Sequence, residues 1–577
     1  MRTPAERFRT LVPLAALTVA SMALLTATSG TLAAWTDDEY VSTGAGVMVA
    51  GDCTTTTLFQ TESAGRQLSG SLGGADLDTL AAVQGVKVGN DNGTVTVTPA
   101  TATQVDPVTY TSALEAGALG TPLLSAAVGL NQSAGNAGAY TQWAQAKASG
   151  QAAGAAGLVS DQSGAIDGTG SAAGSTTAPT VASVNLASFV PSSAAAMTLD
   201  VGAVASSAAV DACTLTNGWP TLDPSPTVDR SYGIAGLRLN LSAGSIQTMT
   251  ASVAETVDGL GQELAAAAAP TRSLTAAVKA GVTGLVLPDS GLTVGSATTE
   301  ITFGAPDLTV ARQLLATPLT DGVVTIDLVN ARIYFDLAKL AHGPAGLNGL
   351  DPNTPVAFDA TNAQILTQRT SALLEAWDEA VTAEVEKALA ATAFTMETTL
   401  LLRAKNGLLG TIDVAEVTLR YDTTVGAFLP RTPPVPLPAP AVSTTILGLG
   451  LPGLELLGSV TAALASGTGA VVAGALEDAL FGSGALVPAA AGAIQSAALP
   501  VTAAAESALT PLADTLSLTV NVQPDQPGAP VGAGAAGSAA DGQYKVSALR
   551  IAAVGSTAEI YLATAAAGPI VFRPGVG

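Results

Sequence analysis

The chain has 577 residues, and 22 Lys and Arg against 45 Asp and Glu give it a formal net charge of −23. A surface that recognises nucleic-acid phosphates needs clustered Lys and Arg, so this balance excludes most nucleic-acid binders, and we predict no nucleic-acid partner. Only 12% of the residues are charged and 4% are aromatic, whereas 48% are hydrophobic. A chain of this length and composition can bury several cores built from small side chains.

The N-terminus has the three parts of a secretory signal. Three arginines precede an apolar stretch at 11–25, and small residues follow at the two positions that a signal peptidase reads. We therefore predict a signal peptide over 1–33, with cleavage between Ala33 and Ala34. The alternative is a retained signal anchor, because no charged residue lies between the last of these arginines and Asp37. Both alternatives export the remainder of the chain, since positive residues stay on the cytoplasmic side.

Cys53 and Cys213 are the only cysteines, and their separation excludes a CxxC redox or zinc motif. An exported chain meets an oxidising environment, so we predict that the two form a disulfide. By the loop-entropy model, closing a loop of roughly 160 positions makes such a bond worth about 4 to 5 kcal/mol.

His342 is the only histidine, which excludes any metal site with two or more His and makes it the only imidazole for a serine or cysteine triad. Its neighbours Ala341, Gly343 and Pro344 are typical of a loop turn. No motif supplies the partners that orient a catalytic histidine. We therefore predict no catalytic residue, no metal and no cofactor.

The N-terminal region, 34–218, is predicted to be β-rich. Alternating residues on both sides of an Asn-Gly turn indicate a β-hairpin at 86–97. From 129 to 175 the composition shifts to Gly, Ala, Ser, Asn and Gln, which suits either a loose surface or a tightly turned strand ladder. Closely spaced prolines at 219–226 then predict a hinge that ends this region.

The central region, 227–428, is predicted to be an α+β domain. Alternating apolar residues predict strands at 234–239 and 414–419, and 324–337 is another strand-rich stretch. Residues 362–392 have apolar side chains at three- and four-residue spacing, with acidic side chains elsewhere. We expect this segment to be an amphipathic helix that covers a sheet and exposes its carboxylates.

A Pro-rich linker at 429–440 must run extended, because closely spaced prolines exclude both a helix and a central strand. The C-terminal region, 441–577, contains an uncharged stretch at 456–476 that is long enough to cross a membrane. We do not expect it to do so, because Glu and Asp flank it where a stop-transfer helix shows Lys or Arg. Residues 570–577 have no hydrophobic tail, basic stop or sorting motif. No membrane span is therefore predicted in the mature chain.

A similar order of elements recurs along the chain. The helix at 362–392 precedes a predicted strand at 395–402, and a second helix at 491–513 precedes a strand at 515–522. Two prolines must kink or break the second helix. A further strand at 546–551 resembles the strands of the central region, at unequal intervals. These elements predict an α+β, β-rich fold of several antiparallel sheet units with covering amphipathic helices and a degenerate internal repeat.

Several stretches resemble families of exported proteins. Trp35-Thr36-Asp37, directly after the expected signal, is similar to the processing region of camelysin and biofilm-fibre proteins. Four further segments resemble the choice-of-anchor G family of surface proteins, namely Gln67–Leu72 with Asp76–Asp78, Gln142–Ala146, Leu199–Ser207 and Ala548–Ile551. That family shares an extracellular region with differing C-terminal anchors, and the resemblance transfers no catalytic residue. The chain departs from the family pattern in that it stops without a recognisable anchor.

The resemblance and the composition imply an exported, non-enzymatic cell-surface or secreted protein of the envelope or matrix, with a structural or adhesive role. Its expected partners are cell-envelope polymers or neighbouring surface proteins, contacted through exposed Thr, Ser and Gly faces or sheet edges. The alternative is a secreted carbohydrate-active hydrolase with a carboxylate pair, which needs no histidine. The sparse aromatic residues disfavour it, because they leave few platforms on which sugar rings could stack.

Overall fold

The structure is a computed structural model that describes residues 52–72, 75–77, 84–113, 128–130, 141–166, 182–186, 197–269, 272–285, 287, 291–406, 410–430, 435–447, 454–531, 542–553 and 558–573. The chain divides into the units Met1–Ala50 and Gly51–Gly577, and every described residue belongs to the second. The predicted signal peptide, with Ala33 and Ala34, lies outside the described residues.

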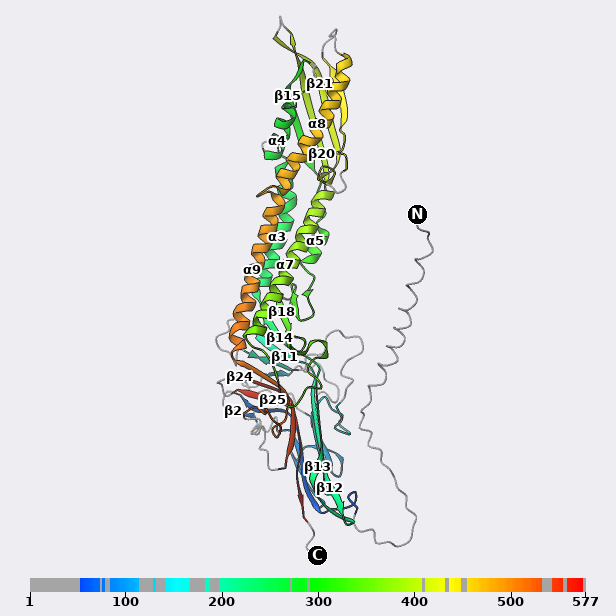
Figure 1. The fold of residues 1–577 in the computed structure, drawn as a ribbon, viewed down its shortest axis with the longest axis vertical. Coiled ribbons are helices and arrows are strands. Elements are labelled where there is room, and N and C mark those ends of the chain that lie inside the picture. Colours follow the sequence, from blue (N-terminus) through cyan, green and yellow to red (C-terminus); the bar gives the residue numbers. More distant parts are fainter. Residues whose placement is uncertain are drawn as a thin grey trace, which may run out of the picture. The chain divides into compact units, whose positions relative to one another are not determined.

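Antiparallel strands and long helices build the second unit, so the predicted α+β, β-rich fold is confirmed (Figure 1). The described strands form four antiparallel sheets. Sheet A has the order β19 (Thr354–Val356), β23 (Leu516–Val522), β24 (Tyr544–Ala553), β25 (Glu559–Phe572), β1 (Phe59–Leu72), β3 (Val86–Asp91) and β4 (Thr94–Thr98), and β2 (Ala75–Asp76) pairs with β1. Sheet B has the order β13 (Trp219–Ile234), β12 (Val204–Thr216), β9 (Gln151–Gly157), β8 (Thr141–Lys147), β6 (Thr109–Ala113) and β5 (Thr103–Asp106).

The other two sheets lie further along the chain. Sheet C has the order β16 (Leu319–Thr320), β17 (Val324–Asp327), β18 (Arg332–Asp336), β14 (Leu237–Ser242), β11 (Met197–Val201), β10 (Ala182–Asn185) and β7 (Val128–Leu130). Sheet D has the order β15 (Leu292–Phe303), β20 (Ala393–Asn406), β21 (Gly410–Thr424) and β22 (Ala441–Ile446).

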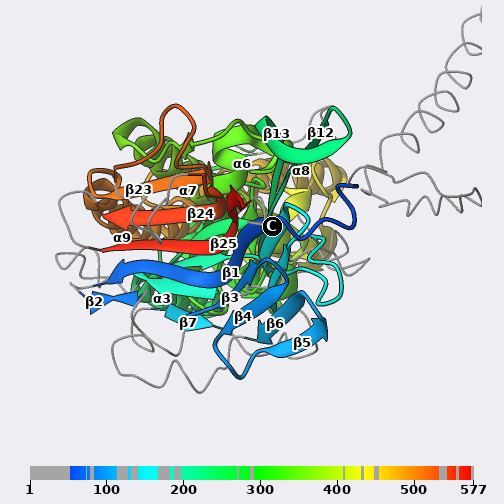
Figure 2. The same ribbon diagram turned by 90° about the horizontal axis from the view of Figure 1, so that it is seen from below.

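Sheet A joins the two ends of the unit. Figure 2 shows its strands side by side, with β1 between β25 and β3. Ser63 of β1 pairs with Ala567 of β25, which is near the C-terminal end of the chain. The three regions expected as separate domains, 34–218, 227–428 and 441–577, thus all contribute strands to one sheet.

Sheets A and B pack face to face more closely than most packed sheets. Such sheets usually lie about 10 Å apart, whereas β1 has Cα atoms within 8 Å of those of β8 and β9, and β25 has Cα atoms within 8 Å of those of β9. Glycine makes this approach possible. A Cβ atom added to Gly65 would lie 2.1 Å from the carbonyl oxygen of Ala155, and one added to Gly154 would lie 2.2 Å from that of Ala64. Within the Gly- and Ala-rich segment, residues 141–157 are therefore a strand ladder.

Polar atoms link the two sheets across this close contact. The backbone N–H of Phe59 donates to the carbonyl oxygen of Ala148 at 3.1 Å. The Thr61 hydroxyl donates to Lys147 O at 3.1 Å. The backbone N–H of Gln67 donates to the side-chain oxygen of Gln142 at 3.0 Å. These bonds satisfy buried polar groups that would otherwise oppose such close packing.

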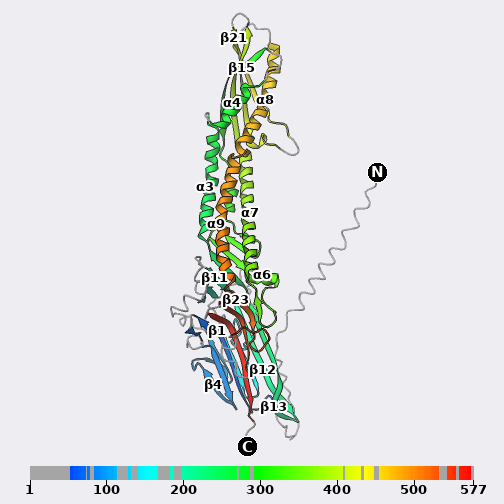
Figure 3. The ribbon, with the colours of Figure 1, turned by 60° about the vertical axis from the view of Figure 1, so that its left-hand side comes forward.

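Three long helices lie side by side, as Figure 3 shows for α3 (Gly244–Ala267), α7 (Ala360–Ala391) and α9 (Leu486–Ala513). In α7 the buried side chains recur at three- and four-residue spacing, as predicted for 362–392. The Asp359 side chain caps its first turn and accepts the backbone N–H of Asn362 at 2.9 Å. The shorter helices are α4 (Ser273–Thr283), α5 (Thr309–Leu314) and α6 (Leu337–His342), with 3-10 turns η6 (Gly343–Ala345) and η7 (Val425–Ala427).

Helix α8 (Leu454–Phe481) contains the uncharged stretch 456–476. Every fourth residue from Val460 to Leu480 is buried, and the Tyr421 hydroxyl of β21 donates to Ala465 O at 3.3 Å. The helical stretch Gly458–Ala513 is long and apolar enough to cross a membrane. Core helices of soluble proteins and signal sequences meet the same criterion, so this property assigns no span.

Most of the predicted elements are present. Strands β3 and β4 form the hairpin expected at 86–97, with Asn92 and Gly93 both at positive φ in its turn. The strands expected at 414–419 and 546–551 lie within β21 and β24. The helix–strand–strand order recurs as α7–β20–β21 and α9–β23–β24. The stretch 234–239 differs, because β13 ends at Ile234 and β14 begins at Leu237.

One expectation about proline is corrected, and of the two alternatives for the second helix, a kink or a break, the break is excluded. The hinge expected at 219–226 is the first half of β13, in which residues 219–222 pair with β12, the register then shifts, and pairing resumes at Thr227. Because β13 is the edge strand of sheet B, its prolines lose no bond that the sheet requires. Pro500 and Pro511 do not break α9. Pro500 lies on the exposed side of the helix, where water can bind the carbonyl that loses its partner.

Candidate functional site

The predicted disulfide is present. Cys53 is bonded to Cys213, with their Cα atoms 5.8 Å apart. Cys213 lies in β12 of sheet B, whereas Cys53 precedes β1 of sheet A. The bond therefore ties the first described residues of the chain to the sheet that packs against β1.

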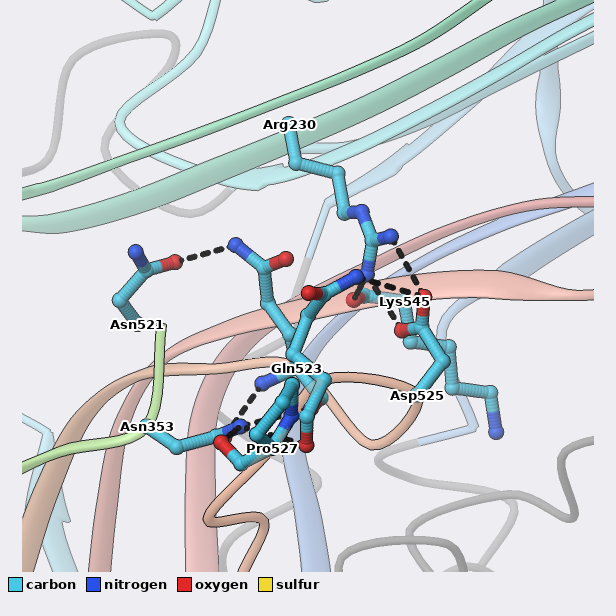
Figure 4. A network of polar contacts seen from close by, with 8 residues as sticks. Arg230, Asn353, Asn521, Gln523, Asp525, Pro527 and Lys545 are labelled. Carbon is cyan, nitrogen blue, oxygen red and sulfur yellow. Dashed lines mark hydrogen bonds and ion pairs between the residues drawn. The ribbon is translucent and has the colours of Figure 1, made fainter. Parts of the chain in front are cut away.

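Arg230 is the centre of a polar cluster between β13 and the connection that follows β23 (Figure 4). Its guanidinium donates to Asp525 Oδ2 at 2.7 Å and to the Lys545 carbonyl oxygen at 3.1 Å. It also lies 5.7 Å from the centre of the Tyr544 ring. Burial opposes ionisation of Asp525, but the hydrogen bonds and charge of Arg230 outweigh this effect and hold the pKa of Asp525 below its usual value.

Asn353, next to β19, joins the same region from the other side (Figure 4). Its backbone has a φ of 61°, and its side-chain amide donates to the carbonyl oxygens of Gln523, Gln526 and Pro527 at 3.0, 3.2 and 3.1 Å. Its side-chain oxygen accepts the backbone N–H of Gln523 at 2.8 Å. A left-handed backbone conformation suits Asn better than most residues.

Asn521 completes the arrangement. Its side-chain amide donates to Leu350 O at 2.9 Å, and its side-chain oxygen accepts from the Gln523 amide at 2.8 Å. We refer to Arg230, Asn353, Asn521, Gln523 and Asp525 as the polar clamp. Their polar groups bind one another and neighbouring backbone atoms, so the polar clamp fastens three segments of the chain and presents no free acid and base for catalysis.

The sequence pattern did not indicate the polar clamp. Arg230 and Asp525 are far apart in the chain, and neither lies in a recognisable motif. The one available signal was the spacing of Asn521, Gln523 and Asp525, in which alternate residues of a strand end are polar. Such a spacing alone suits any solvated strand.

The other side chains that could take part in catalysis or metal binding lie on separate elements. His342 is the last residue of α6 and is partly buried. Of the acidic residues of α7, Glu375 and Glu379 are exposed as expected, but Asp378 is partly buried and its Oδ1 atom has no described partner. Burial raises the pKa of Asp378. The described residues contain no group of three or more His, Cys, Asp or Glu side chains that could hold a metal.

Sheet D presents an open polar face. One row across its four strands consists of hydroxyl side chains, namely Thr298, Thr399, Thr418 and Ser443. The next row contains Glu300, Glu397 and Arg420, with Arg420 and Glu397 3.6 Å apart. Helix α4 lies against the other face, where Leu400, Val417 and Leu419 are buried and Tyr421 donates to Ala465 O of α8. This polar face is the described surface that best fits the expected Thr- and Ser-rich contact surface.

The comparisons with known proteins identify one family. Residues 63–568 match the family described as a domain of unknown function, DUF8394. The match begins in β1 and ends in β25, so it covers the part of the chain that these paired strands enclose. No curated protein and no solved structure matches the chain. Since the match covers most of its length, the chain belongs to the DUF8394 family.

Proposed function

We propose that this chain is an exported, non-enzymatic protein of the cell surface or the secreted envelope or matrix, with a structural or adhesive role. The observation that carries the proposal is the Cys53–Cys213 disulfide, because such bonds persist mainly in oxidising compartments outside the cytosol. The signal-like sequence at 1–33 and the resemblance to choice-of-anchor G surface proteins agree with it.

The construction of the fold supports a structural role. Sheets A and B pack through small side chains, and β1 and β25 hold the two ends of the described unit together. The polar clamp and the disulfide add cross-links between segments that are distant in sequence. Core strands whose side chains are buried, such as β1 and β25, are the parts of a protein that open least.

Cell-envelope polymers and neighbouring surface proteins are the proposed partners, and the polar face of sheet D is their proposed contact surface. The side-chain hydroxyls of this row, such as those of Thr399 and Thr418, can donate hydrogen bonds to polysaccharide hydroxyls and accept hydrogen bonds from them. Replacing both residues with lysine should weaken retention on purified wall polysaccharide. Replacing the exposed Thr248 and Ser252 of α3 with lysine is the matched control, because it adds the same two positive charges away from this face.

The test of export is fractionation of the producing cells into medium, wall and membrane, with intact-mass analysis before and after reduction. We expect a mature chain that begins near Ala34, is found in the medium or loosely on the wall, and gains the mass of two hydrogen atoms on reduction. An uncleaved chain in the membrane would overturn the predicted cleavage, and a reduced chain in the cytosol would overturn export. Release of reducing sugar ends from wall polysaccharide would overturn the non-enzymatic role.

A further inference from the structure

Strand β22 is an edge strand without the usual protection against pairing. It ends sheet D, and no described strand pairs with its outer edge. Every residue of β22 is exposed. Val442 and Ile446 retain 43% and 50% of their accessible surface, although they lie on the face of the sheet where Leu419 and Ala415 are buried. Edge strands normally carry charges, prolines or bulges that prevent association.

Other edge strands carry such features, including β15 at the opposite edge of sheet D, which contains Glu300 and a register shift between Val294 and Ser296. Strand β13 contains Pro220, Pro224 and Pro226 together with charged residues. In β4, Val95 packs against the small core around Val88 and Ala144. By contrast, β22 and the following Leu447 contain no charged residue, in a chain whose net charge is −23.

The backbone register determines which groups point outward. The N–H of Leu447 donates to Val414 O at 3.0 Å, so residues 441, 443, 445 and 447 direct their backbone groups toward β21. The alternate residues, Val442, Thr444 and Ile446, direct their N–H and C=O groups to the free edge. These three positions are arranged symmetrically about Thr444.

The side chains around Thr444 are self-complementary. In an antiparallel pair centred on Thr444, Val442 lies opposite Ile446 of the other strand, and Ser443 lies opposite Thr445. The first pair is apolar and β-branched, and the second pair consists of hydroxyls, which are favourable cross-strand combinations. The outward backbone groups of Val442, Thr444 and Ile446 then form hydrogen-bonded pairs.

We propose that β22 pairs antiparallel with β22 of a second copy of this chain, about a two-fold axis at Thr444, so that the two copies share one continuous sheet. A closed two-fold contact uses the same surface on both copies, as the symmetric pattern of β22 requires. The occupant is a second copy, because β22 matches itself in both side-chain type and hydrogen-bonding register. This inference goes beyond the proposed function and does not depend on export.

Site-specific cross-linking tests the pairing. The two native cysteines are bonded to each other, and the described part of the chain has no free cysteine. Across the proposed axis the two Thr444 Cα atoms should lie about 5.5 Å apart, within the range that a disulfide bridges. The purified full chain with Thr444→Cys should therefore form a disulfide-linked dimer under mild oxidation.

The controls use the same strand. With Val442→Cys alone, the Cα atoms of the two engineered cysteines would lie roughly 14 to 15 Å apart, too far for a disulfide. Combining Val442→Cys with Ile446→Cys should restore the cross-link, because these positions face each other. If Thr444→Cys does not cross-link, or if Val442→Cys alone links equally well, the proposed register is wrong.

A solution measurement gives an independent result. In sedimentation experiments over a concentration series, the unmodified chain should form a dimer. Thr444→Lys places two like charges at the axis and should raise the dissociation constant by about tenfold or more. Ser443→Lys lies away from the axis, on the opposite face, and should have a smaller effect. A chain that stays monomeric, or a dimer that Thr444→Lys leaves unchanged, would overturn the proposal.

Discussion

The close packing of sheets A and B predicts opposite effects for two glycine substitutions in sheet B. In Gly154→Ala, the new Cβ atom would lie 2.2 Å from the Ala64 carbonyl oxygen and 2.5 Å from that of Ala566. Cβ atoms in proteins essentially never lie closer than 3.0 Å to another non-bonded heavy atom. Both carbonyl oxygens belong to the backbone, so neither can move aside as a flexible side chain could. The two sheets must therefore separate locally by most of an ångström, and overpacking of this kind costs about 1 to 3 kcal/mol or more.

Gly233→Ala is the matched control, because Gly233 also lies in a strand of sheet B. Its added Cβ atom would meet only Ile166 Cγ2, at the ordinary contact distance of 3.8 Å. Replacing glycine at such a position reduces the freedom of the unfolded chain and should stabilise the protein by about 0.4 to 1 kcal/mol.

The assay is thermal unfolding followed by circular dichroism, together with limited proteolysis at a fixed temperature. We expect Gly154→Ala to lower the unfolding midpoint by a few degrees and to accelerate cleavage, and Gly233→Ala to leave both unchanged or slightly improved. Equal midpoints for the two variants would refute the reasoning, because they would mean that the sheets do not approach each other as closely as these distances require.

Three further predictions concern the cross-links of the fold. Replacing both Cys53 and Cys213 with serine should lower stability by about 4 to 5 kcal/mol if loop entropy dominates, which chemical denaturation measures; an unchanged midpoint would contradict this. The pKa of Asp525 is lower in the folded than in the unfolded chain, so its stabilisation is complete above about pH 4 and is lost as the pH falls through the folded-state value. Asp525→Asn should therefore lower the free energy of unfolding at neutral pH and make it fall less steeply as the pH is lowered. If the free energy of unfolding depends on pH in the same way in both chains, the pair with Arg230 contributes nothing to stability. Asn353→Asp keeps the shape but removes donors to three carbonyl oxygens and should cost about 1 to 3 kcal/mol at neutral pH, whereas tolerance of this change would contradict the assigned amide orientation.

Local patterns predicted individual elements well. The helix over 362–392 was predictable because its apolar spacing matches one helical face, and α7 buries Leu366, Trp377 and Leu389 as expected. The hairpin at 86–97 was predictable because its Asn-Gly turn allows positive φ at both central residues. Each of these signals lies within a short stretch of chain.

Patterns of composition were less informative about packing. The prolines of 219–226 predicted a hinge, but an edge strand accommodates prolines because its outer hydrogen-bonding groups need no partner within the sheet. Asp378 was assigned to a solvated helix face, yet its Oδ1 atom is buried without a described partner. The burial of a carboxylate depends on which other segment covers it, and the periodicity of its own helix carries no such information.

By itself, the sequence determined the class of fold, the helices α7 and α9, the hairpin of β3 and β4, and the pairing of Cys53 with Cys213, since two lone cysteines in an oxidising environment have one intramolecular partner each. Only the tertiary structure decided that β1 pairs with β25, that glycines bring sheets A and B together, and that Arg230 meets Asp525. The physical reason is that a strand satisfies its backbone with any partner of compatible register. The choice among partners depends on the packing of side chains from distant parts of the chain.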